Sequence, residues 1–360
     1  MKQMLERHIP PLAARHPALM TVASATAGLL RSMAIKLYRP RHRPREQALW
    51  ERYPSLPAVR CQLYREKSAG SNPTIVIGGF VPDATEAVEF QRPTLRRHGS
   101  IYYLNFPRNG FSQELFEGQL ADLIDDLALN GERPALMAVS FGAGLLVEFL
   151  RRAPESIHEK IRGLVLVSPV LCTADLIRAA GERSGGVRML ESNLRKIMGA
   201  DPANEYDLNR QLERARRCFQ ALFEAGAENR PLTTRHLTIR SRIFEVLEQT
   251  SNLGGYERVL ALKRFAVPCG QRSIYSGPSL LLVAEDEESV LVPSSPTLCL
   301  VRDHERLRVM LPDVRLRKVS SPDAADPVAH ASLIFHHHAF NPLLEDWLER
   351  LHRHPLWAVV

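Results

Sequence analysis

The sequence is poor in cysteine, with five among 360 residues, and no two of them stand in a Cys-x-x-Cys pair. An odd number of cysteines without close spacing is neither a disulfide framework nor a zinc knuckle. We therefore expect reduced, mostly buried thiols and a cytoplasmic protein. The five are Cys61, Cys172, Cys218, Cys269 and Cys299.

The N-terminal region lacks an uncharged run long enough to span a bilayer. Pro17–Leu30 carries no charge, but its fourteen residues include Thr and Ser and cannot cross ~30 Å of hydrocarbon. The segment follows Arg7 and Arg15 and contains Ala-Ser-Ala, as a secretory signal does. A basic stretch from Lys36 to Arg45 comes next. We expect a helix packed on the body and a charged linker; the alternatives are a helix resting on anionic lipid, which would make the protein membrane-associated, and secretion.

A large charge of one sign is also absent, because 47 basic and 40 acidic residues leave a net charge of +7. This excess suits an anionic partner such as a membrane surface or a phosphorylated carrier. The basic residues are not interleaved with aromatic ones, so we expect no nucleic acid partner. With 45% hydrophobic and 24% charged residues, the chain is typical of globular proteins. Its length predicts one large domain or a core with an inserted subdomain.

From residue 58 onward, short apolar runs alternate with segments of helical periodicity. An alternating edge strand is expected at 58–66, and buried strands are expected at 74–77, 101–104, 135–139 and 164–167. Strands that alternate with helices predict an α/β protein with a doubly wound, mostly parallel sheet.

The pattern changes after residue 172, where strand signals nearly disappear for about a hundred residues. Helical stripes replace them, the clearest of which places Leu208, Leu212 and Ala215 on one face. Strand character returns at 279–283 and at 314–319, and a terminal amphipathic helix follows. We therefore predict an N-terminal helix and basic linker at 1–48, a core at 49–172, a helical cap or lid at 173–276, and the rest of the core at 277–360.

Residues 135–144 contain an apolar strand, a tight turn at Ser140 and an apolar helix. The residues two before and two after the serine are small, Ala138 and Gly142, as a sharp strand-to-helix turn requires. Such a turn exposes the hydroxyl above the carboxyl edge of the sheet, where the helix N-terminus favours a developing anion. We interpret Ser140 as a nucleophile; the alternative is a serine that only caps the helix.

Over about residues 58–350, the sequence resembles the α/β-hydrolase superfamily. Gly78, Gly79 and Phe80 stand where that family has His-Gly-x, and residues 107–112 are similar to its Arg-Gly-x-Gly-x-Ser loop. The turn at Ser140 has alanine in place of the family's first glycine. The resemblance implies an α/β-hydrolase fold with an inserted cap, no cofactor, and a Ser, acid, His order along the chain.

The resemblance also implies a base and an acid. His330 lies in a loop after the last strand, where the family has its histidine. After the strand that ends at residue 284, the family pattern Gly-x-x-Asp-x-x-Val places Glu287 at the acid position. Asp286 becomes the partner if the match slips by one residue, and Asp175 is a third candidate. We favour Glu287.

By the same resemblance, the oxyanion hole consists of the backbone N–H groups of Phe80 and Phe141. Gly78 and Gly79 let the backbone approach a ligand without interference from Cβ atoms. The alternative is that these two glycines form only a turn after a strand.

Three consecutive histidines, His336–His338, invite a metal interpretation. Consecutive helical side chains diverge by about 100° and do not converge on one ion. We expect partly exposed helix residues and no metal; the alternative is that one of them lines the site.

Together these features predict a serine hydrolase that cleaves a carboxylic ester, thioester or lipid ester through an acyl-enzyme on Ser140. The apolar stripes and the many arginines of the cap suit a small acyl substrate, either lipid or anionic. One alternative is a hydrolase-fold protein that binds or scaffolds without turnover. Another is an acyltransferase or amidase that uses the same three residues.

Overall fold

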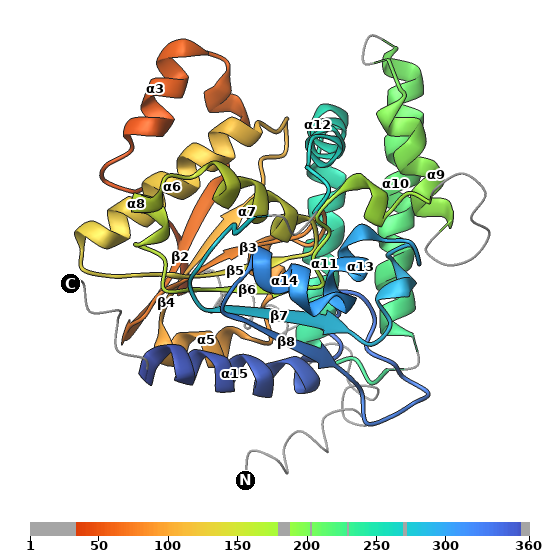
Figure 1. Ribbon diagram of the computed structural model, residues 1–360. Helices are drawn as coiled ribbons and strands as arrows, with labels where there is room; N and C mark the ends of the chain where they lie inside the picture. Colours follow the sequence, from red (N-terminus) through yellow and green to blue (C-terminus); the bar gives the residue numbers. More distant parts are fainter. Residues whose placement is uncertain (1–33, 179–187, 202–203, 229, 269–271, 354–360) are drawn as a thin grey trace.

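The computed structural model describes residues 34–178, 188–201, 204–228, 230–268 and 272–353. Its centre is an eight-stranded sheet in the order β1-β2-β4-β3-β5-β6-β7-β8 (Figure 1). β2 is antiparallel to β1 and β4, and the other neighbouring pairs are parallel. The strands are β1 (Ile35–Leu37), β2 (Gln62–Ser71), β3 (Thr74–Ile77), β4 (Gly99–Asn105), β5 (Ala135–Val139), β6 (Gly163–Val167), β7 (Ser279–Ala284) and β8 (Val314–Val319).

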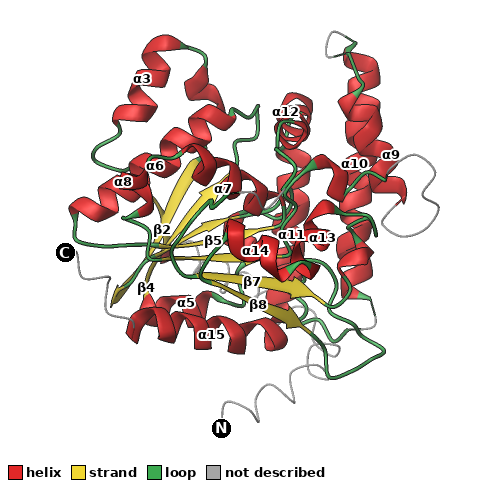
Figure 2. Cartoon of the chain, viewed as in Figure 1, coloured by secondary structure: helices red, strands yellow, loops and turns green. Residues whose placement is uncertain are grey.

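Helices cover both faces of this sheet (Figure 2). Those of the core are α3 (Pro44–Arg52), α4 (Ala84–Ala87), α5 (Arg92–His98), α6 (Gln113–Leu129), α7 (Phe141–Arg152), α8 (Glu155–His158), α13 (Pro296–Arg302), α14 (His304–Met310) and α15 (His337–Arg353). Short 3₁₀ helices are η1 (Leu56–Val59), η2 (Thr173–Asp175) and η3 (Glu287–Ser289).

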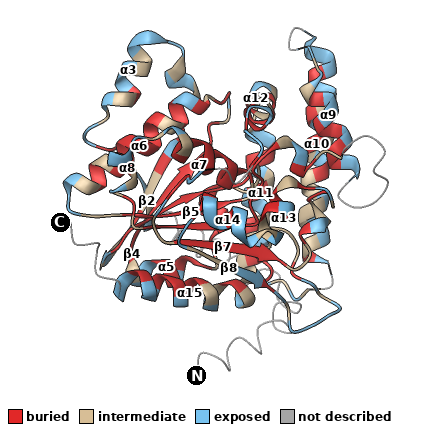
Figure 3. Cartoon of the chain, viewed as in Figure 1, coloured by how far each residue is buried: buried red, intermediate tan, exposed pale blue. Residues whose placement is uncertain are grey.

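Successive residues of the central strands sort into two hydrophobic cores, because their side chains point alternately to opposite faces. Ile75 and Leu136 join the core that α6 and α7 cover, while Val76 and Met137 join the core that α5 and α15 cover. Every residue of β3, β5, β6 and β7 is buried (Figure 3), as in parallel sheets with helices on both faces. The doubly wound, mostly parallel sheet is confirmed.

Among the described residues between β6 and β7, four α-helices form the cap: α9 (Arg188–Met198), α10 (Glu205–Ala227), α11 (Thr234–Gln249) and α12 (Asn252–Lys263). The predicted stripe of Leu208, Leu212 and Ala215 is buried on α10, which contacts each of the other three. In Figure 2 the cap lies beyond the arrowheads of β7 and β8. It therefore faces the carboxyl edge of the sheet, where ligands bind in open α/β folds.

The basic stretch that begins at Lys36 is packed on the core instead of forming a linker. It overlaps β1 and the start of α3, neither of which the sequence predicted. The Tyr38 hydroxyl donates to Asp126 Oδ2 at 2.5 Å, and Arg45 Nη1 lies 2.6 Å from Asp125 Oδ2. These acids on α6 neutralise part of the basic run, which the local sequence could not indicate.

The predicted helix at 17–30 lies outside the described residues. Within the described ranges, no helix combines the length and apolarity needed to cross a membrane. The edge strand expected at 58–66 is β2, which is not at the edge, because β1 pairs with its outer side. It begins only at Gln62, because η1 precedes it, and runs to Ser71. Pro57 in η1 has a fixed φ and no N–H for a sheet ladder.

Candidate active site

Ser140 occupies a strained turn between β5 and α7. Its φ is 51° and its ψ is −118°, a combination that non-glycine residues adopt only when their surroundings force it. Its N–H donates to Val167 O at 2.9 Å, and its carbonyl accepts from Val170 N at 3.2 Å. A Cβ on Gly142 would lie 2.2 Å from Gly78 O, so only glycine fits there. The turn is therefore held from β6 and from the loop after β3.

The Ser140 hydroxyl makes no capping bond to α7. Its Oγ instead lies 2.9 Å from His330 Nε2. This contact favours the interpretation of Ser140 as a nucleophile over that of a helix cap, since a base must lie within hydrogen-bond reach of the proton it removes.

His330 is held in a loop between β8 and α15. Its N–H donates to Ser289 Oγ at 3.2 Å, and the N–H of Ala331 donates to Ser168 Oγ at 2.9 Å. Ala331 has a φ of 52°, so the chain turns sharply after the histidine. The imidazole is 6% exposed. These contacts fix where the ring lies before any substrate arrives.

Glu287 is the carboxylate beside the histidine. Its Oε2 lies 2.5 Å from His330 Nδ1, and its Oε1 accepts the N–H of Ala284 at 2.7 Å. The side chain is 4% exposed. A proton on Nδ1, donated to Glu287, leaves Nε2 free to accept from Ser140. Ser140, His330 and Glu287 are thus joined, in this order, by two successive hydrogen bonds.

Of the two other acid candidates, Asp175 is engaged elsewhere through its carboxylate, and Asp286 is held through its backbone. Asp286 is joined through its backbone N–H to Val328 O at 3.0 Å. Asp175 is fully buried and accepts from the hydroxyls of Ser295 and Thr297 at 2.5 and 2.7 Å. The geometry therefore places Glu287, and neither Asp286 nor Asp175, against the histidine.

The neighbouring acid, Glu285, helps to shape the histidine loop. Its Oε1 accepts the N–H groups of Ser321 and Val328, each at 2.8 Å. These two bonds lower the pKa of Glu285, because they stabilise the ionised carboxylate. An ionised Glu285 therefore holds the segment between β8 and His330 in place.

The predicted oxyanion residues lie next to the serine. A Cβ on Gly79 would be 3.5 Å from Ser140 Cβ, so the loop after β3 runs alongside the turn. Phe141 is the first residue of α7, and its N–H has no partner within the helix. The ring of Phe80 stacks on the ring of Phe141. Gly78 is also required sterically, since a Cβ there would meet Pro82 O at 2.7 Å.

A cavity of about 380 Å³ opens at Ser140 and His330, within the size range of small-molecule sites. It lies between core and cap, and most of its wall is apolar. The cap contributes Phe219, Leu222, Phe223 and Ile243, and the core contributes Phe80, Val81, Val139, Val170, Leu333 and Phe335. Arg230, Asp326 and His336 form a polar cluster in one part of the wall.

His336 in this cluster is buried instead of partly exposed, and it is the histidine of the three that lines the cavity, as the alternative held. It is 1% exposed, its Nδ1 contacts Ser332 Oγ at 2.8 Å, and its Nε2 lies 2.9 Å from Arg230 Nη2. Burial and the nearby guanidinium lower the pKa of His336. A neutral ring that donates from Nδ1 and accepts at Nε2 satisfies both contacts. His337 is half-buried and His338 is exposed, as expected.

Sequence reasoning missed the serines that hold the histidine loop, Ser168 and Ser289, and the cap arginines near the site. A single serine after a strand carries no signal of its own, and the arginines stand among many others. Only the folded chain brings Arg230 and Arg258 to the cavities.

No protein-family model and no curated protein matches the sequence, but several solved structures match the fold. An esterase from Thermogutta terrifontis is 15% identical, with a TM-score of 0.55 over 81% of this chain and 94% of its own. MenH from S. aureus is 12% identical, with a TM-score of 0.54 over 81% and 99%. A bacterial membrane phospholipase A is 14% identical, with a TM-score of 0.55 over 98% and 100%. With its sheet order and its helical insert between β6 and β7, the chain has the α/β-hydrolase fold.

Proposed function

We propose that this protein is a serine hydrolase that cleaves a carboxylic ester, thioester or lipid ester through an acyl-enzyme on Ser140. The observation that carries the proposal is the line from Ser140 Oγ to His330 Nε2 at 2.9 Å and from His330 Nδ1 to Glu287 Oε2 at 2.5 Å. Nucleophile, base and orienting acid are the three parts that acyl transfer on serine requires.

The reaction follows from these positions. His330 takes the proton of Ser140 as Oγ attacks the acyl carbon, and Glu287 stabilises the imidazolium that forms. The N–H groups of Phe80 and Phe141 stabilise the oxyanion. When the bond to the leaving group breaks, His330 returns the proton to that group. Water, deprotonated by the same histidine, then attacks the acyl carbon. As the bond from that carbon to Ser140 Oγ breaks, His330 returns the proton to Oγ and the acid is released.

The apolar lining of the cavity favours an acyl group as the part of the substrate that the cavity binds. Part of its apolar wall consists of Phe219, Leu222 and Phe223. Moving a hydrocarbon chain of the substrate from water onto such a wall stabilises the complex by about 25 cal/mol per Å² of apolar surface buried. An enclosed polar substrate would leave its hydrogen-bonding groups without partners on this wall. The esterases among the structural neighbours are consistent with this choice.

Among the substrates of this proposal, a lipid ester is distinguished from a soluble ester by one observation. It is favoured by the likeness to the membrane phospholipase A, which extends over 98% of this chain, against 81% for the Thermogutta esterase. Turnover of phospholipid vesicles, with p-nitrophenyl butyrate as the soluble reference, separates the two substrates. Faster release of fatty acid from vesicles would assign the lipid ester.

The proposal is tested with a fluorophosphonate probe, which reacts with activated serines. The wild type should label, and Ser140→Ala and His330→Ala should not, while thermal unfolding shows that both variants are folded. Ester hydrolysis should fall in parallel by about 10³-fold or more. Equal labelling of wild type and Ser140→Ala would overturn the proposal. A folded wild type that neither labels nor hydrolyses any ester would indicate a binding protein.

A further inference from the structure

Arg258 is a charged residue of the cap that is buried against the core. It lies on α12 and is 3% exposed. Its Nη2 donates to Pro107 O at 2.7 Å and its Nη1 to Phe80 O at 3.4 Å. Its guanidinium carbon lies 5.3 Å from the centre of the Phe106 ring. One side chain of the cap thus contacts both loops that follow β3 and β4.

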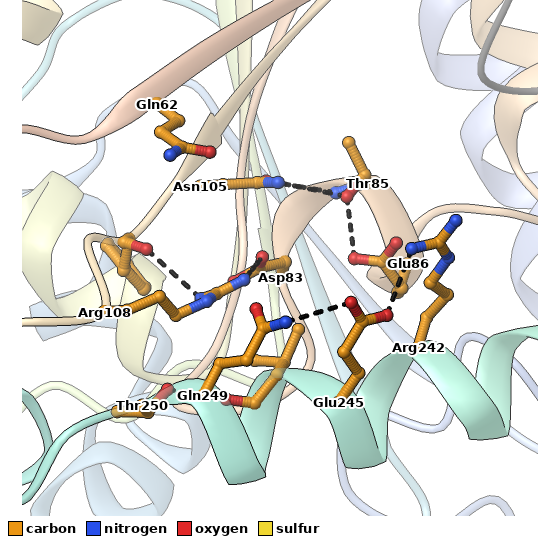
Figure 4. A network of polar contacts seen from close by, with 12 residues as sticks. Gln62, Asp83, Thr85, Glu86, Asn105, Arg108, Arg242, Glu245, Gln249 and Thr250 are labelled. Carbon is orange, nitrogen blue, oxygen red and sulfur yellow. Dashed lines mark hydrogen bonds and ion pairs between the residues drawn. The ribbon is translucent and has the colours of Figure 1, made fainter.

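Among the described residues, no carboxylate lies within ion-pair distance of the Arg258 guanidinium. Its Nε is buried without a hydrogen bond. The acid that most favours its charge is Asp83, but Asp83 is paired with both Nη groups of Arg108 (Figure 4). Burial lowers the pKa of Arg258 to about 10, so the group remains cationic at neutral pH.

An uncompensated buried charge is costly to a fold. If its purpose were only to join cap and core, a neutral side chain that donates to the same two carbonyls would serve. A buried positive charge can, however, stabilise negative charge that develops nearby during a reaction, because electrostatic attraction is strong in a buried, low-dielectric environment. The position of Arg258 beside Phe80 meets that condition.

The link to the reaction runs through Phe80. Its carbonyl accepts from Arg258, its ring stacks on Phe141, and its N–H is one of the two proposed oxyanion donors. An arginine that fixes the Phe80 carbonyl limits rotation of this residue, and so limits where its N–H points. Donors that are already oriented stabilise the oxyanion without reorganisation during the reaction.

We propose that Arg258 is a positioning residue for the hydrolysis, which holds the oxyanion loop through Phe80 and adds its buried positive charge to the field at the oxyanion. The proposal rests on the proposed function of Ser140. It makes the cap part of the catalytic machinery as well as a cover over the substrate.

A neighbouring arginine provides a matched control. Arg216 and Arg258 line the same small cavity of about 60 Å³ between cap and core. Arg216 donates only to cap residues, to Thr250 O at 2.5 Å, to Asn252 Oδ1 at 3.2 Å and to Glu213 Oε2 at 3.2 Å. Removing either charge alters the cap, but only Arg258 contacts the oxyanion loop.

The experiment compares Arg258→Met, Arg258→Lys and Arg216→Met with the wild type in the full-length protein. Measured are kcat and KM for p-nitrophenyl butyrate and the midpoint of thermal unfolding. We expect Arg258→Met to lower kcat by about 10- to 100-fold, less than loss of a direct oxyanion donor, with KM changed by less than about threefold. Arg258→Lys should recover part of kcat, because it restores the charge without the planar fork. Arg216→Met should retain the wild-type kcat.

Each outcome decides the proposal. A folded Arg258→Met with kcat within about threefold of the wild type overturns it, as does an equal loss in Arg216→Met, which would indicate a general role in cap stability. If Arg258→Met does not fold, Arg258→Lys decides: a lowered kcat at constant KM supports the proposal, and an unchanged kcat overturns it. An inert wild type overturns the proposed function as well, whereas an active wild type with an unaffected Arg258→Met overturns this inference alone.

Discussion

The ring of Phe80 stacks on the ring of Phe141, with centroids 4.1 Å apart and planes inclined by 13°. Phe80 follows β3 and Phe141 begins α7, so the stack joins two segments sixty-one positions apart in the chain. Phe141 is fully buried, and Phe80 covers it on the side of the cavity. Since the N–H groups of both residues are the proposed oxyanion donors, the stack sets the spacing of those donors.

Phe80→Ala should therefore reduce catalysis and stability together. We expect kcat to fall by about 10-fold or more, because one donor loses its support. The free energy of unfolding should fall by about 1–3 kcal/mol, less than for a fully buried phenylalanine. Steady-state kinetics and urea denaturation measure the two effects.

Phe219→Ala is the control for the stack. Phe219 lines the same cavity, and its ring lies 6.2 Å from that of Phe80, but it belongs to the cap. It should change KM more than kcat. If Phe80→Ala changes only KM, as Phe219→Ala should, the stack does not position the donors.

The choice between neighbouring acids leads to a second prediction. Glu287→Gln keeps the size of the side chain but removes the charge beside His330 Nδ1, and it should lower kcat by roughly 10³- to 10⁴-fold. Asp286→Asn should leave kcat within about threefold, because its neighbour holds the histidine. Both variants should unfold near the wild-type temperature. A deeper loss in Asp286→Asn would assign the acid to Asp286.

The sequence predicted several strands closely, two in the centre of the sheet and one at its edge. The expected strands 74–77, 135–139 and 314–319 coincide with β3, β5 and β8. These strands are short apolar or alternating runs between glycine, proline or polar residues, so local physics defines where they end. Ser140 was proposed for a related reason, since it stands in a short motif at the end of β5. His330 was assigned by the family resemblance instead, because it lies in a loop eleven residues after the end of β8.

The features that the sequence did not settle depend on long-range contacts. β1 is three residues long with no buried residue, and it exists because it pairs with β2. The run Glu285–Glu288 contains four acids, and only the turn of η3 decides that Glu287 faces inward while Glu285 holds the loop. Arg258 carries no local signal, since its role comes from two carbonyls more than a hundred residues earlier in the chain.

Gly142→Ala is expected to damage the turn at Ser140. The added Cβ would lie 2.2 Å from Gly78 O and 2.9 Å from Ile77 Cγ2. Neither neighbour can move freely, because Ile77 belongs to β3 in the centre of the sheet. The free energy of unfolding should fall by about 2 kcal/mol or more, and displacement of Gly78 should abolish most of the activity.

Gly199→Ala is the control for this substitution. The nearest atom to a Cβ there is Arg195 O at 3.4 Å, an ordinary contact, and Gly199 is exposed. Stability should stay the same or rise by up to about 1 kcal/mol. A Gly142→Ala variant as stable and active as Gly199→Ala would contradict the packing at the turn.

His236 should make the stability of the protein depend on pH. It is the third residue of α11 and part of the capping box at the start of that helix, where its Nδ1 accepts from the N–H of Thr233 at 3.2 Å. Its ring lies 4.5 Å from that of Phe90. Burial, and to a lesser degree His337 and the guanidinium groups of Arg235 and Arg230, lower the pKa of His236 to about 4. The folded state therefore favours the neutral ring, which is the form that can accept at Nδ1.

The sign of the pH effect follows from this shift. Above pH ~6.5 the histidine is neutral in both the folded and the unfolded chain, so it contributes no pH dependence there. As the pH falls from about 6.5 toward 4, the unfolded chain binds a proton that the folded chain does not, and the free energy of unfolding decreases. Urea denaturation at pH 7.5 and pH 5 should show a smaller loss for His236→Gln than for the wild type, whereas His304→Gln, at an exposed position, should lose as much as the wild type does. An equal loss in all three proteins would show that His236 titrates alike in the folded and unfolded chains, and that its ring does not need to be neutral to cap α11.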